Sequence, residues 1–209
     1  MLDKLGIAAA AAAAAVIGFA GPAMAEHIVG TNQADNLTGT NNIDTIRALA
    51  GDDTIRALGG SICSALECRG DRIFAGDGND WADGGRGYDV MWGGLDNDTL
   101  LAGGHNDDIH GLEGADTVRG EDGGDRVTGG PGDDRVFGGN SGDTLIPDTL
   151  STNGGGADHV WAGPGNDGVG VANDGKADHI NCGDGDDFVD LFNDDRDPLD
   201  TYISCERFV

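Results

Sequence analysis

Apolar and acidic positions recur along the chain with a fixed period of nine residues. From Ile28 to Thr144 the register does not shift, which defines 13 units. A large apolar residue occupies the first position of eleven units, and Asp occupies the eighth position of twelve. We expect each unit to form a strand of about three residues with its central side chain facing inward, followed by a six-residue turn. A fixed short period predicts a solenoid in which each coil contacts its neighbours.

The period is irregular in two regions. Between 55 and 72 the repeat pattern is lost, because Ile62 stands where Asp is expected and Ser64 where a large apolar residue is expected. This stretch is either two degenerate units or one unit with an insertion near 60–70. After Thr144 the units at 145–159 and 169–179 are longer than nine residues. We therefore expect N-terminal capping repeats at 26–45, a regular body at 46–189 and a C-terminal cap at 190–209.

The first 25 residues have the pattern of a secretory signal peptide. An apolar run at 5–20 is followed by Gly21-Pro22 and by Ala23-Met24-Ala25, a small-x-small cleavage pattern. The alternative is a transmembrane anchor, but the run has 16 residues, and a spanning helix needs about 20. The sequence therefore predicts cleavage after Ala25 and a secreted, extracellular product with no membrane insertion.

The composition is strongly acidic, and most of the acidic residues are Asp. The net charge is −26, with 38 acidic residues against 12 Lys and Arg, and 33 of the acids are Asp. So few basic residues argue against a nucleic-acid partner. Carboxylates stacked on successive coils about 4.8 Å apart would repel each other. A hard divalent cation between them would reverse this effect, and carboxylate and carbonyl oxygens are ligands that calcium prefers.

High charge and 39 glycines are also typical of a disordered linker. The apolar residue at every ninth position argues against that alternative.

The glycines cluster just before the recurrent Asp. The loops Gly84-Gly85-Arg86-Gly87-Tyr88-Asp89 and Gly129-Gly130-Pro131-Gly132-Asp133-Asp134 illustrate the pattern. It resembles the Gly-Gly-x-Gly-x-Asp-x-aliphatic-x repeat of the RTX, or haemolysin-type, calcium-binding family. The resemblance implies an all-β fold, a parallel β-roll in which two nonapeptides form one coil. It also implies several Ca²⁺ ions between same-side loops of consecutive coils, held by Asp carboxylates and glycine-loop carbonyls.

The resemblance assigns ligands residue by residue. It would pair Asp80 with Asp98, Asp89 with Asp107, Asp98 with Asp116, Asp107 with Asp125, Asp116 with Asp134, and Asp125 with Asp143. The expected carboxylate ligands are Asp71, Asp80, Asp89, Asp98, Asp107, Asp116, Asp125, Asp134, Asp143, Asp158, Asp167 and Asp187. The expected loop glycines are Gly76, Gly78, Gly85, Gly87, Gly94, Gly130 and Gly132.

Four cysteines in an exported chain indicate two disulfides, for which three pairings are possible. We favour Cys63–Cys68, which would close the irregular loop, together with Cys182–Cys205, which would fasten the C-terminal segment over the last coil. A thiol metal or redox site is the alternative, and the chain has no Cys-x-x-Cys motif to support it.

Catalytic motifs are absent from the sequence. It has no His-Glu-x-x-His, no Gly-x-Ser-x-Gly and no phosphate-binding glycine loop ending in Lys-Ser or Lys-Thr. The repeats occupy most of the chain after residue 25, and the five histidines are scattered. We therefore expect a protein that is not an enzyme.

Positions 2 and 9 of each unit flank the inward residue and should point outward. We expect one exposed row of Phe74, Trp92 and His110, with Trp81, Thr99 and Thr117 in the row beside it. Such a face could bind a polysaccharide or a cell surface, although strands in general favour aromatic and β-branched residues. The sequence leaves two functions open: calcium binding coupled to folding after export, and adhesion through Phe74, Trp81 and Trp92.

Overall fold

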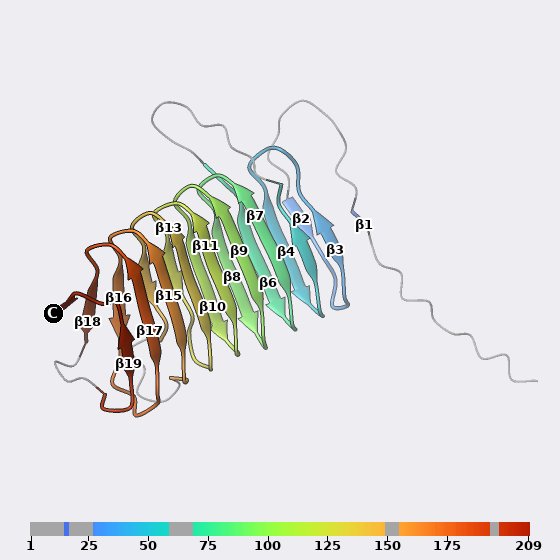
Figure 1. Cartoon of the computed structure of the whole chain (residues 1–209). Helices are drawn as coiled ribbons and strands as arrows, with labels where there is room; N and C mark the ends of the chain where they lie inside the picture. Colours follow the sequence, from blue (N-terminus) through green and yellow to red (C-terminus); the bar gives the residue numbers. More distant parts are fainter. Residues whose placement is uncertain (1–14, 17–26, 59–68, 149–154, 193–196) are drawn as a thin grey trace, which may run out of the picture.

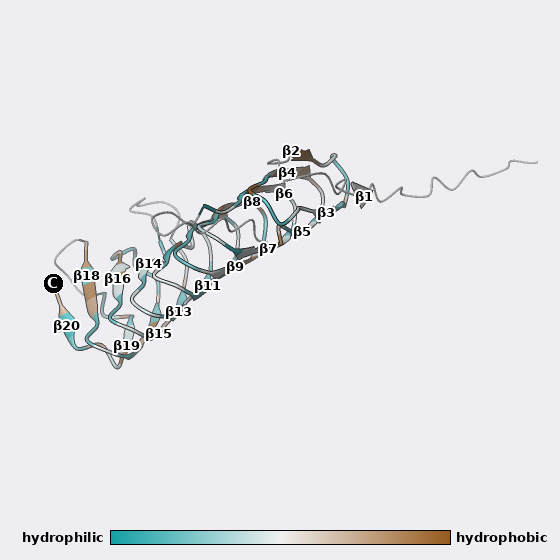
Figure 2. Ribbon diagram, turned by 90° about the horizontal axis from the view of Figure 1, so that it is seen from above, coloured by the Kyte–Doolittle hydropathy of each residue, from teal (hydrophilic) through white to brown (hydrophobic). Residues whose placement is uncertain are grey.

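The computed structural model describes residues 15–16, 27–58, 69–148, 155–192 and 197–209. Within these residues the chain is all β and winds into a solenoid with two parallel sheets of ten strands each (Figure 1). Successive strands alternate between the sheets, so that two strands make one coil. Figure 2 shows the even-numbered strands along one side and the odd-numbered strands along the other. The predicted parallel β-roll is confirmed.

We call the two layers the odd sheet and the even sheet. The odd sheet consists of β1 (Ala15–Val16), β3 (Asn36–Thr38), β5 (Thr54–Arg56), β7 (Trp81–Arg86), β9 (Thr99–Gly104), β11 (Thr117–Asp122), β13 (Arg135–Asn140), β15 (His159–Pro164), β17 (His179–Asp184) and β19 (Thr201–Ile203). The even sheet consists of β2 (His27–Val29), β4 (Thr45–Ala50), β6 (Arg72–Asp77), β8 (Val90–Leu95), β10 (Asp108–Glu113), β12 (Arg126–Thr128), β14 (Thr144–Ile146), β16 (Gly168–Val171), β18 (Phe188–Leu191) and β20 (Arg207–Phe208).

Many strands are longer than the three residues expected. In β8 and β10, Met91 pairs with Ile109 and Trp92 with His110, and pairing then resumes with Gly94 and Leu112. The two skipped residues, Gly93 and Gly111, are buried and interrupt the pairing within each strand. The strand therefore runs on into the glycine-rich segment, and in this part of the chain only three residues form the turn.

The core is a column of stacked apolar side chains, one from each of the strands β2 to β18. Ile73, Met91 and Ile109 are fully buried from the even sheet, and Leu100 and Val118 from the odd sheet. Their inward orientation is as the nine-residue period predicts. A second inward position lies two residues further along the chain and holds a small side chain in much of the roll, whereas Val171 and Leu191 occupy it after Val169 and Val189. Its buried members include Ala48, Ala57, Ala75, Ala102, Ala162 and Cys182.

The irregular region between 55 and 72 forms one unit. Ile55 lies in β5 and Ile73 in β6, which are consecutive strands on opposite sheets. Ile73 therefore follows Ile55 by 18 positions, whereas the inward residues of consecutive strands are nine positions apart in the regular units. Cys63 and Cys68, with their predicted disulfide, lie outside the described residues.

Both chain ends contribute strands. At the N-terminus β1 pairs with β3, and the rest of the predicted signal peptide lies outside the described residues. At the C-terminus β19 pairs with β17 and β20 with β18, so the segment expected to be a cap is itself a further coil. The predicted Cys182–Cys205 disulfide is present and joins β17 to the turn before β20, with the two Cα atoms 5.2 Å apart. Within the described residues, no helix is long and apolar enough to cross a membrane.

Candidate calcium sites

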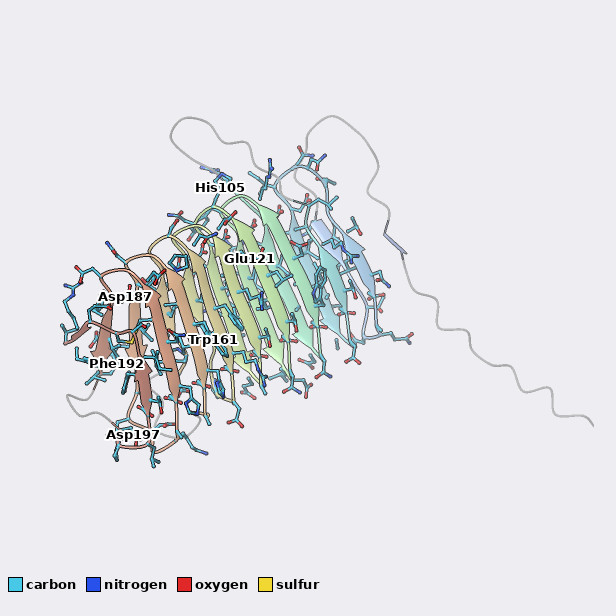
Figure 3. The ribbon with its side chains drawn as sticks, viewed as in Figure 1. His105, Glu121, Trp161, Asp187, Phe192 and Asp197 are labelled. Carbon is cyan, nitrogen blue, oxygen red and sulfur yellow. A yellow bond between two sulfur atoms is a disulfide. The ribbon has the colours of Figure 1, made fainter. Side chains whose placement is uncertain are left out.

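Two ladders of acidic residues run along opposite edges of the solenoid. Each ladder residue stands directly before a strand, and Figure 3 shows Asp187 at one edge and Asp197, from a loop of the other ladder, at the opposite edge. The odd ladder consists of Asp35, Asp53, Asp80, Asp98, Asp116, Asp134, Asp158, Asp178 and Asp200. The even ladder consists of Asp44, Asp71, Asp89, Asp107, Asp125, Asp143, Asp167, Asp187 and Glu206.

Within each ladder, consecutive coils are linked by a repeated hydrogen bond. The main-chain N–H of Asp80 donates to Oδ1 of Asp98 at 2.9 Å, and that of Asp89 donates to Oδ1 of Asp107 at 2.7 Å. The same bond joins Asp98 to Asp116, Asp107 to Asp125, Asp116 to Asp134, and Asp125 to Asp143. All six same-side pairs named from the sequence are therefore in contact. These links also continue across the lengthened loops, from Asp134 to Asp158 and from Asp143 to Asp167.

The second carboxylate oxygen of most ladder residues is buried without a partner. Among the described residues, Oδ2 is buried and makes no hydrogen bond in Asp53, Asp80, Asp89, Asp98, Asp107, Asp116, Asp125, Asp134, Asp143, Asp158, Asp167, Asp178 and Asp187. A buried charged oxygen without a partner is costly. The ladders therefore present two columns of oxygen atoms that lack a compensating positive charge.

The raised pKa values of the ladder carboxylates also show that burial opposes their ionisation. Removal from water is the main cause that raises the pKa of Asp98, Asp107 and Asp134 to about 8, and neighbouring ladder carboxylates raise it further. For Asp80 and Asp116 burial raises the pKa to about 6, while the hydrogen bond from the preceding coil opposes the rise. Without a bound cation, burial in this fold disfavours the ionised carboxylates.

Backbone carbonyls lie close to the loop glycines of the next coil. Gly114 and Gly132 have φ values of +146° and +139°, in the left-handed region that favours glycine. A Cβ at Gly132 would collide with the carbonyl oxygen of Gly114, and one at Gly114 would collide with that of Asp96. The expected glycines Gly76, Gly78, Gly94 and Gly130 make similar approaches to a carbonyl of the preceding coil, Gly87 approaches Gly70, and Gly85 shares the positive φ.

Comparison with known protein families agrees with this geometry. A family model described as the RTX calcium-binding nonapeptide repeat, in four copies, matches residues 29–61, 69–100, 89–118, 101–136, 110–145 and 154–169. These matches cover more than half of the chain. The chain belongs to the RTX calcium-binding repeat family. A search of curated proteins found no match.

The oxygen atoms of this RTX roll fit the ion that the family implies. Most turns offer a buried carboxylate oxygen without a partner and loop carbonyls that face the neighbouring coil. An all-oxygen set of this kind suits a hard cation such as calcium. The ladder carboxylates and the glycine-loop carbonyls would hold the ions, which would supply the positive charge that the buried oxygens lack.

In the first two RTX loops, a threonine donates hydrogen bonds to the second carboxylate oxygen of the ladder residue. The main-chain N–H and the hydroxyl of Thr31 both donate to Oδ2 of Asp35, at 2.6 and 2.9 Å. Thr40 does the same for Oδ2 of Asp44. At the equivalent position of later loops, Gly76 and Leu112 have positive φ, and the loop backbone follows another path. Thr31 and Thr40 thus act as internal donors where the later loops leave an oxygen unpaired.

Several ladder residues were missed among the ligands named from the sequence. Asp35, Asp44 and Asp53 share the Asp position of the repeat, and Asp178 occupies it after a longer loop. Asp200 and Glu206 end the ladders, where Asp178 N–H donates to Asp200 and Asp187 N–H donates to Glu206, both at 3.0 Å. The signal common to all of them is an acidic residue two positions before an inward apolar residue, as in Asp200-Thr201-Tyr202.

The prediction that Trp81 lies beside the Phe74 row is wrong. Phe74, Trp92 and His110 lie on β6, β8 and β10 of the even sheet, whereas Trp81, Thr99 and Thr117 lie on β7, β9 and β11 of the odd sheet. The ninth residue of a unit directly precedes the next inward residue, so it belongs to the next strand and to the opposite face. Phe74, Trp81 and Trp92 therefore do not form one surface.

The aromatic rings stack on each other along the solenoid. The centroids of Phe74 and Trp92 lie 4.5 Å apart with planes 6° apart, and the Arg47 guanidinium lies 5.0 Å from the Phe74 ring centroid. On the odd sheet, Phe137 and Trp161 form a second stack at 4.6 Å, with Trp161 at the outer face (Figure 3). Ring faces in these stacks contact neighbouring rings, so the geometry does not favour the stacking of sugar rings on them.

Proposed function

We propose that this protein is exported and that calcium binding to its two ladders drives its folding outside the cell. The observation that carries the proposal is the column of buried Oδ2 atoms without a hydrogen-bond partner. Each of these oxygens disfavours the folded chain until a cation neutralises it. Calcium would convert these destabilising oxygens into links between consecutive coils.

Calcium binding would be coupled to folding through mass action. A ligand that binds only the folded chain stabilises it, and the effect grows with ligand concentration and with the number of sites. At low calcium the net charge of −26 opposes a compact state. At extracellular calcium concentrations the ions offset both this repulsion and the desolvation of the ladders.

Two features support export as part of the proposal. The first 25 residues have the pattern of a signal peptide. The Cys182–Cys205 disulfide is of the kind that persists in oxidising compartments outside the cytosol.

The proposed role is structural and not enzymatic. Raised pKa values are also a feature of acid–base catalytic sites, but calcium ligation would account for those of the buried ladder carboxylates. In this proposal the stacked aromatic rings pack against one another on the outer faces of the sheets, and we do not assign adhesion to them.

Far-ultraviolet circular dichroism of residues 26–209 tests this function. The chain is titrated with calcium, then with chelator, and separately with magnesium. We expect a cooperative rise of β signal with calcium, its reversal by chelator, and no such rise with magnesium at equal concentration. A full β signal in chelator at pH 8 would refute the coupling of folding to calcium. Export is tested separately, by recovery of a chain that begins at Glu26 from the culture medium.

A further inference from the structure

The loops that connect the even sheet to the odd sheet lengthen near the C-terminus. Between β10 and β11 this loop has three residues, whereas between β16 and β17 it spans residues 172–178. Asp148 stands just after β14, and Asp174 lies in the loop after β16. Neither residue belongs to a ladder, and neither occupies the Asp position of a nonapeptide.

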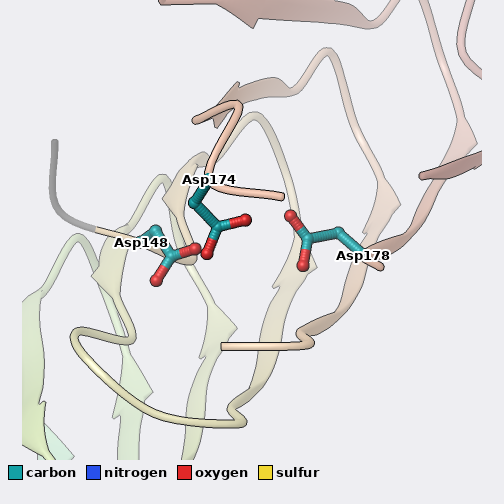
Figure 4. Close-up of side chains that lie close together, drawn as sticks. All are labelled: Asp148, Asp174 and Asp178. Atoms are coloured by element: carbon teal, nitrogen blue, oxygen red, sulfur yellow. The ribbon is translucent and has the colours of Figure 1, made fainter. Parts of the chain in front are cut away.

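These two residues meet a ladder residue in space. The carboxylate groups of Asp148, Asp174 and Asp178 each place an oxygen within 4.8 Å of the others. Asp148 and Asp178 are each only 1% exposed, and Asp174 is partly buried. Figure 4 shows the three carboxylates directed toward one another from separate stretches of chain.

The hydrogen bonds leave oxygens of this cluster unpaired. Asp148 Oδ1 accepts a long hydrogen bond, 3.4 Å from the Gly156 amide. Asp174 Oδ1 accepts the Lys176 amide at 2.8 Å, and Asp178 Oδ1 accepts the Asp158 amide at 2.9 Å. Oδ2 of Asp148 and Oδ2 of Asp178 are buried with no partner. Within the described part of the chain, no Lys, Arg or His forms an ion pair with any of the three carboxylates.

Gly155 lies beside the same oxygens. A Cβ at this position would collide with Asp174 Oδ2 and would lie 2.9 Å from Asp148 Oδ2. These two oxygens therefore converge on a space that a side chain at residue 155 would fill. Three converging carboxylates without a cation would repel one another.

We propose that Asp148, Asp174 and Asp178 form a calcium site outside the repeat pattern, which ties the two lengthened loops to the odd ladder. The ligands are all carboxylate oxygens, which favours a hard cation, and the unequal loop lengths suit the irregular geometry that calcium accepts. The site requires the folded coil but not the assignment of any particular ion to the repeats, because Asp148 and Asp174 are absent from both ladders.

Counting bound calcium tests the proposal. The variant Asp148→Asn/Asp174→Asn keeps the ladder residue Asp178 and removes two negative charges. The control Glu113→Gln/Asp184→Asn removes two charges from exposed residues at the ends of β10 and β17. Both variants and the unmodified chain are saturated with calcium, checked for the β signal, and compared by native mass spectrometry and equilibrium dialysis. We expect the site variant to bind one calcium ion fewer than the unmodified chain and the control to bind the same number.

An unchanged count in the folded site variant would overturn the proposal. If the double variant does not fold, Asp174→Asn is used instead, because Asp174 is a partly exposed loop residue. It should weaken one ion at least ~10-fold, since fewer charged ligands lower calcium affinity, and an unaltered binding curve would again overturn the proposal. A chain that binds no calcium would refute the proposed function as well, whereas normal ladder binding without this ion would refute only the additional site.

Discussion

The main-chain amide of Asp98 donates to Oδ1 of Asp116 at 2.8 Å, although 18 residues separate them in the chain. The bond fixes the position of one carboxylate oxygen on each coil. Asp116 Oδ2 is then buried with no partner. The same geometry repeats along both edges. Carboxylate oxygens without a compensating positive charge are therefore a property of the whole roll and not of one site.

The calcium-free fold should be more stable in acid than at neutral pH. Burial raises the pKa of Asp98, Asp107 and Asp134 from the usual 3.8 to about 8. The folded chain therefore holds more protons than the unfolded chain between pH ~4 and ~8, and its stability falls as the pH rises through this window. In chelator, the β signal of circular dichroism should be larger at pH 5 than at pH 8. Equal signals, or a larger one at pH 8, would contradict this.

Removing one ladder charge should have opposite effects with and without calcium. In Asp107→Asn the side-chain carbonyl can still accept the Asp89 amide, while the buried negative charge is lost. In chelator at pH 8 we expect the free energy of unfolding to rise by about 1–3 kcal/mol. The calcium concentration at the folding midpoint should also increase, because a ligand is missing. Urea unfolding and calcium titration measure the two effects, with the exposed Asp184→Asn as control. A lower stability in chelator would refute this account.

The first loop should depend on Thr31 in place of a metal ion. Thr31→Val removes the hydroxyl that donates to Asp35 Oδ2 at 2.9 Å and keeps the shape of the side chain. The free energy of unfolding in saturating calcium should fall by about 1 kcal/mol. Native mass spectrometry should find the number of bound calcium ions unchanged. A change in that number would show that the first loop is a calcium site.

In β11, a glycine substitution should stabilise the fold at Glu121 and destabilise it at Thr117. Glu121 has a φ of +76°, a conformation that costs about 1–2 kcal/mol in a residue with a side chain. Glu121→Gly should therefore raise the free energy of unfolding by about 1 kcal/mol. Thr117→Gly lies in the same strand, β11, without a positive φ, and should lower it by a similar amount. Chemical unfolding in calcium compares the two, and a loss of stability in Glu121→Gly would contradict the strain argument.

The C-terminal coil should depend on its disulfide. Cys182 occupies the small inward position that Ala48, Ala75 and Ala102 occupy in other strands, so alanine fits there. The variant Cys182→Ala/Cys205→Ala removes a cross-link between residues 23 apart and should lower the free energy of unfolding by about 3 kcal/mol. Reduction of the unmodified chain, which would also break the predicted Cys63–Cys68 bond, should cause at least this loss in urea unfolding. A stability equal to that of the oxidised chain would show that the cross-link is dispensable.

Much of the fold is predictable from the nonapeptide register. A period of nine with two strands per coil brings residue i beside residue i + 18, and Ile109 accordingly pairs with Met91. The same rule brings Asp98 beside Asp116 before any coordinates are known. The sequence predicts these contacts because each coil repeats the local conformation of the one before it, so that local preferences and long-range contacts agree.

Other features depend on the tertiary structure. The sequence by itself determined the solenoid and its recurrent Asp, its RTX resemblance implied two columns of Asp, and it favoured Cys182–Cys205 among three possible pairings. Only the fold decided that Trp81 lies opposite Phe74, that Thr31 serves Asp35 where later loops leave an oxygen unpaired, and that Asp148 meets Asp174. The physical reason is that the period sets the spacing between coils. It does not set the path of the backbone within a loop, nor the position of a side chain in a loop that departs from the repeat.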